Sequence, residues 1–169
     1  MFLTSLPILF GFTHLISPLE LSLFLLALLI GVFLITPQPS HYAAVDPYSR
    51  IYLYLQAAWL GNISLWRVFW PFFVLINLVF VYIDYRIANN TYTISSWKTV
   101  HGMVFLPIVW WIVAVWRCSV HTSSRYWASA ARTLTLYLLL ELFLRFIMST
   151  QFPRLLFNCE MLLLEYGDC

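Results

Sequence analysis

The sequence predicts an all-α, polytopic membrane protein with about four transmembrane helices in a small bundle. Of its 169 residues, 62% are hydrophobic and only 9% are charged, whereas soluble domains carry about a quarter charged residues. A soluble fold of this length could not bury so much apolar surface, because small domains leave a large share of their chain exposed. Aromatic residues make up 19% of the chain, and many flank the apolar runs, where Trp and Tyr favour the bilayer interface.

The first predicted span covers residues 19–35. It belongs to an apolar run, residues 2–36, that is too long for one membrane helix. About 35 helical residues would extend roughly 50 Å, against a hydrocarbon core of about 30 Å. Ser17 and Pro18 interrupt the run, and they suit the N-cap and the first turn of a helix. The span therefore starts just after them.

The residues ahead of this span, 2–16, are predicted to form an interfacial or re-entrant segment or a short additional span. A cleaved signal peptide is a competing interpretation. Such leaders begin with positive charge, however, and no Lys or Arg precedes Arg50. A further span at this end would move the N-terminus across the membrane and leave the later orientation unchanged.

Three further apolar runs have the length of a membrane span, at residues 65–82, 100–116 and 127–148. Ser64 is a suitable N-cap for the first of these. Pro71 and Pro107 lie inside two of them, and membrane helices tolerate such prolines. A C-terminal tail, residues 150–169, follows the last span, and the whole chain is a single membrane domain.

The segment between the first two spans, residues 40–62, mixes polar and apolar side chains. Its central part, residues 51–59, is amphipathic enough to lie on the membrane surface as a helix. An ordinary loop with one helical turn explains the same pattern, and the sequence leaves both interpretations open.

Basic residues near the helix ends predict the orientation, because cytoplasmic loops are enriched in Lys and Arg. With four spans, the loops 37–64 and 117–127 share one side of the membrane. Five arginines lie on or near that side: Arg50, Arg67, Arg117, Arg125 and Arg132. The other side has Arg86, Lys98 and Arg154, with Arg145 near it. The small excess predicts that the two loops are cytoplasmic and both termini are outside.

Glu141 and Arg145 are the most distinctive polar residues within a predicted span. They are four residues apart, so both project from one face of the helix and can pair. Each costs about 2.5–3.5 kcal/mol at the bilayer centre unless it is paired or buried. The pair indicates either a polar pathway or docking site for a partner subunit, or an intrahelical ion pair whose arginine reaches toward the nearer surface.

A cluster of tryptophan and arginine surrounds the turn between the last two spans, with Trp116, Arg117, Trp127 and Arg132. Arginine at a helix end suits lipid phosphates, backbone carbonyls and aromatic faces. The cluster therefore predicts a topology anchor with an aromatic belt, or a docking site for phospholipid headgroups or a partner protein.

No metal or cofactor is predicted. The histidines are too far apart in sequence for a local ligand set, at His14, His41, His101 and His121. Haem ligation could use only His14 and His101, which are expected near helix ends. In the tail, Cys159 and Cys169 could form a disulfide if they face an oxidising compartment, or they could remain free thiols.

The sequence has no Walker loop, GxGxxG, GxSxG, HExxH or CxxC pattern. It also has no basic tract of the kind that binds nucleic acid. Membrane lipids and other integral membrane subunits are therefore the expected partners.

Two segments carry a resemblance to known proteins. Residues 61–70 read GNISLWRVFW, and residues 115–119 read VWRCS with Trp127 and Arg132 following. They resemble the LWxxFW and VWRC…W…AR segments of small bacterial inner-membrane proteins. The resemblance covers roughly residues 60–135 and implies a bacterial source and an inner-membrane location, but no reaction.

The bulky side chains of the spans predict poor packing within the chain itself, because membrane helices associate through close contact of small residues and polar bonds. Large aromatic faces would instead pack against another protein. We therefore expect a non-enzymatic accessory or assembly subunit of a larger bacterial inner-membrane complex, such as a secretion, pilus or respiratory assembly. The alternatives are a small transporter or channel that uses Glu141 and Arg145, and a lipid-acting or redox membrane enzyme.

Overall fold

The computed structural model describes residues 17–38, 50–89 and 93–151. Every regular element in these ranges is helical. Residues 2–16, Cys159 and Cys169, on which sequence-based predictions rest, lie outside the described residues. The helices are α1 (Pro18–Ile35), α2 (Ile51–Leu60), α3 (Leu65–Ala88), α4 (Ile94–Cys118), the 3-10 turn η1 (Ser119–His121) and α5 (Arg125–Gln151).

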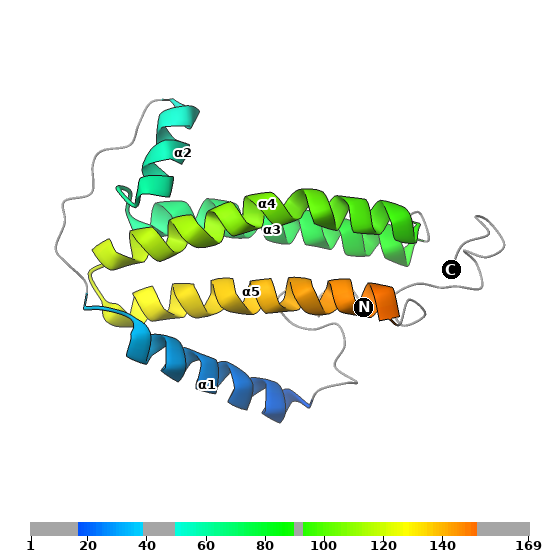
Figure 1. The fold of residues 1–169 in the computed structure, drawn as a ribbon, viewed down its shortest axis with the longest axis horizontal. Helices are drawn as coiled ribbons and strands as arrows, with labels where there is room; N and C mark the ends of the chain where they lie inside the picture. The colour runs from blue at the N-terminus through cyan, green and yellow to red at the C-terminus, as the bar shows by residue number, and fades with distance from the viewer. Residues whose placement is uncertain (1–16, 39–49, 90–92, 152–169) are drawn as a thin grey trace.

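The three long helices α3, α4 and α5 are apolar and long enough to cross a membrane. They run side by side along the longest axis of the molecule (Figure 1). Helix α1 is also apolar but has 18 residues, which gives it a length of about 27 Å, near the lower limit for a span. The described residues therefore form an all-α membrane bundle with three long helices and two shorter apolar helices, α1 and α2.

Two helix starts have side-chain caps. Ser17 and Glu20 form a reciprocal capping box at α1, which satisfies two N–H groups that would otherwise lack partners. At α4, the Thr93 hydroxyl accepts a hydrogen bond from the Ser96 N–H. With this cap α4 begins at Ile94, six residues before the predicted span, and the polar residues ahead of position 100 form the first turns of the helix.

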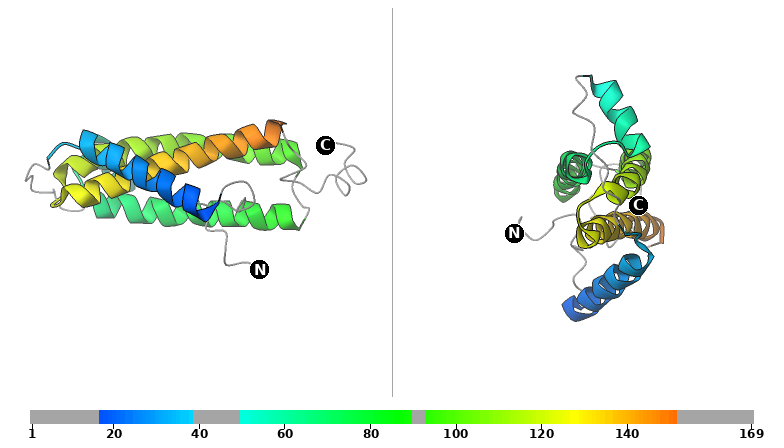
Figure 2. Two further views of the ribbon diagram at one scale, coloured as in Figure 1. Left: turned by 90° about the horizontal axis from the view of Figure 1, so that it is seen from below. Right: turned by 90° about the vertical axis from the view of Figure 1, so that its left-hand side faces the viewer.

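Helix α4 is the centre of the arrangement and packs against both α3 and α5. Side chains also join α3 directly to α5: the rings of Trp66 and Trp127 lie 5.1 Å apart, and further along Arg145 contacts Asp84 at 3.1 Å. Helix α1 lies on the outer side of α5, as the end-on view shows (Figure 2). The described helices thus form a three-helix cluster with α1 added at one side.

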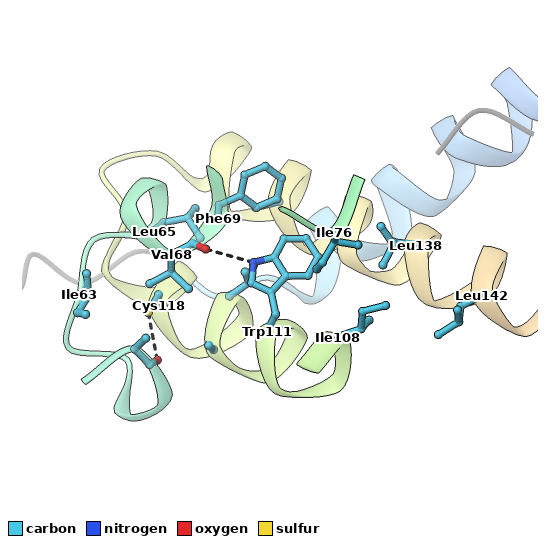
Figure 3. Packing of buried hydrophobic residues seen from close by; sticks show 14 of the residues in the cluster. Ile63, Leu65, Val68, Phe69, Ile76, Ile108, Trp111, Cys118, Leu138 and Leu142 are labelled. Carbon is cyan, nitrogen blue, oxygen red and sulfur yellow. Dashed lines mark hydrogen bonds between the residues drawn. The ribbon is translucent and has the colours of Figure 1, made fainter. Parts of the chain in front are cut away.

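Trp111 is one of two fully buried tryptophans in the cluster between α3 and α4. Its side chain is fully buried, and its Nε1 donates a hydrogen bond to the Val68 carbonyl oxygen at 3.2 Å (Figure 3). The ring also packs against Phe69, with 5.6 Å between centroids. A buried indole needs such a partner for its N–H, so this bond fixes the register of α4 against α3.

Helix α2 projects away from the bundle, across the direction of α3 and α4 (Figure 1). It has ten residues, so segment 51–59 forms a full helix rather than a loop with a single turn. The helix ends at Gly61, whose φ of +82° is left-handed and is a conformation that glycine adopts without strain. A Cβ at this position would lie 3.1 Å from the Arg117 Cβ, so glycine also permits the close approach to α4.

Candidate functional site

The described helices create two polar clusters, one at each end of the bundle. We call the first the arginine end. Here α1, α2 and α4 finish close to the start of α5 (Figure 1). The last carbonyl groups of a helix have no partner within that helix, and they form the negative end of its dipole. Three arginines donate to carbonyls of this kind.

Arg117 binds the end of α2. Its Nη1 donates to the Trp59 carbonyl oxygen at 2.8 Å, and its guanidinium carbon lies 4.7 Å from the Trp59 ring centroid. Arg125 binds the end of α1 in the same way: its Nη2 donates to the Phe33 carbonyl oxygen at 2.8 Å, and it lies 4.5 Å from the Phe33 ring centroid. Each arginine thus combines a helix C-terminal bond with a cation–π contact.

Arg132 binds the end of α4 from a buried position, with only 5% of its surface exposed. Its Nη2 donates to the Trp116 carbonyl oxygen at 3.2 Å, and its Nε donates to the Ser119 hydroxyl at 2.7 Å. A longer contact of 3.4 Å joins Nη1 to the Thr36 hydroxyl, just after α1. Through these neutral acceptors the guanidinium connects α1, α4 and α5.

The Trp116 side chain completes this cluster. Its ring lies 5.0 Å from the Arg132 guanidinium carbon, and its Nε1 donates to the Thr135 hydroxyl at 3.1 Å. The sequence-predicted residues Trp116, Arg117 and Arg132 are all engaged in contacts within the chain. Trp127 also packs within the chain, against Trp66, but is half exposed. Sequence reasoning missed Arg125 as a site residue, because its partners are backbone carbonyls of α1 that no side-chain pattern reveals.

We call the second cluster the acidic end. Arg145 of α5 contacts Glu141 at 3.0 Å, as the four-residue spacing predicts, and also reaches Asp84 of α3 at 3.1 Å. Both Arg145 contacts to Glu141 use the Oε1 oxygen. Glu141 is buried and its Oε2 has no hydrogen-bond partner in the described chain. No sequence pattern indicates Asp84 as the third member, because it lies 61 residues before Arg145.

A cavity of about 10 Å³ adjoins this triad, lined by Phe80, Leu138, Leu142 and the Glu141–Arg145 pair. This is close to the minimum volume that one water molecule needs. The Arg145 guanidinium also lies 5.5 Å from the Phe80 ring centroid. The triad therefore joins α3 and α5 by ion pairs that are largely closed to the surroundings.

His101 lies near the triad on α4. Its ring stacks on Trp97 with 3.7 Å between centroids, and its Nδ1 is 3.0 Å from the Trp97 carbonyl oxygen. A carbonyl only accepts hydrogen bonds, so Nδ1 carries the proton. An apolar groove of about 270 Å³ runs beside His101 between α4 and α5, past Phe105 and Phe143.

Within the described ranges, no three His, Cys, Asp or Glu side chains gather in a way that could hold a metal ion. Cys118 is buried, and its Sγ lies 3.5 Å from the Ala58 carbonyl oxygen. The contact between Cys118 and Ala58 holds α2 against α4, and the thiol is not accessible at the surface.

Comparison with known proteins gives no match to any family model, curated protein or solved structure.

Proposed function

We propose that this protein is a non-enzymatic accessory or assembly subunit of a larger complex in a bacterial inner membrane, of the secretion, pilus or respiratory type. The observation that carries the proposal is the aromatic outer face of α3. Trp66 and Trp70 stack there with 6.0 Å between centroids and 15° between planes. Phe73 packs edge-on against Trp70 at 5.9 Å. Both tryptophans are 40% or more exposed.

This face continues along the helix as exposed large side chains at helical spacing, namely Val74, Leu78, Val81 and Tyr85. Lipid is as apolar as these residues, so binding within the membrane must come from close packing. Stacked tryptophans offer a large and rigid contact area at a low cost in side-chain entropy. Such a face suits another membrane subunit.

The charged residues support the same proposal because the structure uses them internally. Arg117, Arg125 and Arg132 hold helix ends together, and Arg145 holds α3 to α5. A transporter would need its intramembrane charges to face a water-filled route, whereas the cavity beside Glu141 is only about 10 Å³. The contacts are those of a rigid scaffold.

A small transporter or channel remains the second candidate, because Glu141 Oε2 has no hydrogen-bond partner among the described residues. This function requires the triad to open and admit water. Flux through proteoliposomes that disappears in E141Q, while the variant unfolds at a similar temperature, would favour it over the scaffold proposal.

The scaffold proposal is tested by purifying the tagged full chain in mild detergent from its own cells. We expect partners in fixed stoichiometry, and we expect W70A to lose them while retaining the fold. The matched control is L23A, at an exposed position of α1, which should retain the partners. A monodisperse monomer without partners, or equal retention in W70A and L23A, would contradict the proposal.

We propose further that the arginine end faces the cytoplasm, as the arginine excess predicts. Ser123 lies exposed at this end, and Ser95 lies exposed at the other. With the native cysteines replaced, a Cys at position 123 should react only after the membrane is permeabilised. A Cys at position 95 should react in intact spheroplasts, and the reverse pattern would invert the orientation.

A further inference from the structure

An apolar groove between α1 and α5 at the arginine end has no role in the scaffold described above. Its volume is about 430 Å³, within the range of small-molecule sites. Helix α1 contributes Leu29, Ile30 and Phe33 to its walls, and α5 contributes Tyr126, Trp127 and Ala130. The groove exists because Ser129 and Ala130 are short, and a larger side chain at either position would fill it.

A positive charge adjoins the groove. Arg125 lies over Phe33, a wall residue, with 4.5 Å from its guanidinium carbon to the ring centroid. Its hydrogen bonds go to the Phe33 and Leu34 carbonyls, so no carboxylate in the described residues neutralises it. A ligand with an apolar chain in the groove would place a neighbouring anionic group beside this arginine.

The charge distribution of the described helices also favours a ligand with an anionic group at this end. Glu20 starts α1, Asp84 is near the end of α3, and Glu141 is late in α5, so these carboxylates lie away from the arginine end. An excess of arginine at a membrane surface attracts anionic lipids. At the mouth of the groove Tyr126 and Trp127 are 74% and 54% exposed, and such rings favour the headgroup level of a bilayer.

We propose that this groove binds one anionic phospholipid, with an acyl chain between α1 and α5 and the phosphate beside Arg125. The groove starts at Tyr126 and Trp127, which mark the bilayer interface, and continues between the apolar helices α1 and α5. A lipid has the same order, with its headgroup at the interface and its acyl chain in the apolar layer. The groove adjoins the partner surface proposed on α3, because Trp127 of its wall packs against Trp66 at 5.1 Å, and the variants below therefore avoid both tryptophans.

The test uses native mass spectrometry of the purified full chain in detergent, titrated with phosphatidylglycerol or phosphatidylcholine. We expect one phosphatidylglycerol to bind preferentially. In A130F, where a phenyl ring fills the groove, this binding should be lost. The matched control is A27F, at an exposed position of α1 outside the groove, which should bind normally.

The headgroup contact has its own variants. R125Q should bind phosphatidylglycerol about fivefold more weakly, the effect of one basic residue near a lipid surface, and R125K should restore most of the affinity because it keeps the charge. R67Q removes an exposed arginine that does not line the groove and should weaken binding much less than R125Q. Equal binding of the two lipids, or unchanged affinity in A130F or in R125Q, would overturn the proposal. Thermal unfolding shows whether A130F or R125Q loses the fold. If one of them does, lipid binding by the other one tests the proposal.

Discussion

Tyr54 donates its hydroxyl hydrogen bond to the Arg67 carbonyl oxygen at 2.6 Å, and Pro71 explains why that carbonyl is available. In a regular helix the N–H of residue 71 would bind the carbonyl of residue 67, but proline has no N–H. The hydroxyl from α2 therefore fills a position that α3 leaves open. Burial raises the pKa of Tyr54, which keeps the hydroxyl protonated as a donor.

Removal of this hydroxyl in Y54F should destabilise the protein by about 1 kcal/mol, because the carbonyl loses its partner. The loss should be smaller when P71A is also present, because alanine returns a backbone N–H that can bind the carbonyl. Thermal unfolding of the four proteins in detergent gives a double-mutant cycle. Equal costs of Y54F with and without P71A would contradict the relationship.

Gly61 lies in the turn after α2 and Gly102 lies inside α4, so the same Gly-to-Ala change at the two positions tests the role of the turn. G61A should destabilise by about 1–2 kcal/mol, because alanine disfavours the left-handed backbone and its Cβ would meet Arg117 at 3.1 Å. G102A places a methyl group where no atom lies within 4 Å apart from the adjacent residues and the local backbone of its own helix. It should stabilise α4 by about 0.5–1 kcal/mol, the usual difference between alanine and glycine inside a helix. Unfolding temperatures that move in the same direction would contradict this assignment.

The helical architecture could be predicted because lipid imposes a simple rule. Backbone groups within a bilayer must be satisfied inside the segment, so long apolar runs become helices, and the sequence shows such runs directly. Ser17 and Ser64 marked two helix starts close to where α1 and α3 begin, although the Ser64 side chain makes no cap hydrogen bond. Thr93 was missed, because a cap followed by polar residues lacks the apolar start that the prediction used.

The polar clusters could be predicted only where the partners are neighbours in sequence. Glu141 and Arg145 pair across one helical turn, and a spacing rule finds such contacts. Asp84, 61 residues away, depends on the packing of α3 beside α5, which a single sequence does not encode in any local pattern. At the arginine end the sequence indicated Arg117 and Arg132 but neither Arg125 nor the acceptors, since most of the acceptors are backbone oxygens common to every residue.

Within the acidic end, the three ionic residues should differ in their effects on stability. R145M should destabilise most, by about 3 kcal/mol, because it leaves the buried Glu141 carboxylate without its partner. D84N should cost less than about 1 kcal/mol, since the Asp84 side chain is 30% exposed and water compensates in part. The double variant R145M/E141Q should recover stability relative to R145M. Chemical unfolding in detergent measures the free energy of unfolding of each variant. If R145M/E141Q is no more stable than R145M, the unpaired charge of Glu141 is not the cause of the loss.

At the arginine end, the contacts of Arg132 require a specific side-chain geometry. Its planar guanidinium donates from different nitrogens to Ser119, Trp116 and Thr36, a fork that a lysine ammonium group cannot reproduce. R132K therefore keeps the charge but should destabilise by about 2 kcal/mol, because buried hydroxyl and carbonyl groups lose their donor. The control R67K, at an exposed arginine, should change stability by less than about 0.5 kcal/mol. Spin labels on α1 and α5 should also show a broader distance distribution in R132K, since the contact to Thr36 is lost. Equal unfolding temperatures for R132K and R67K would mean that positive charge alone, rather than the geometry of the bonds, holds this end together.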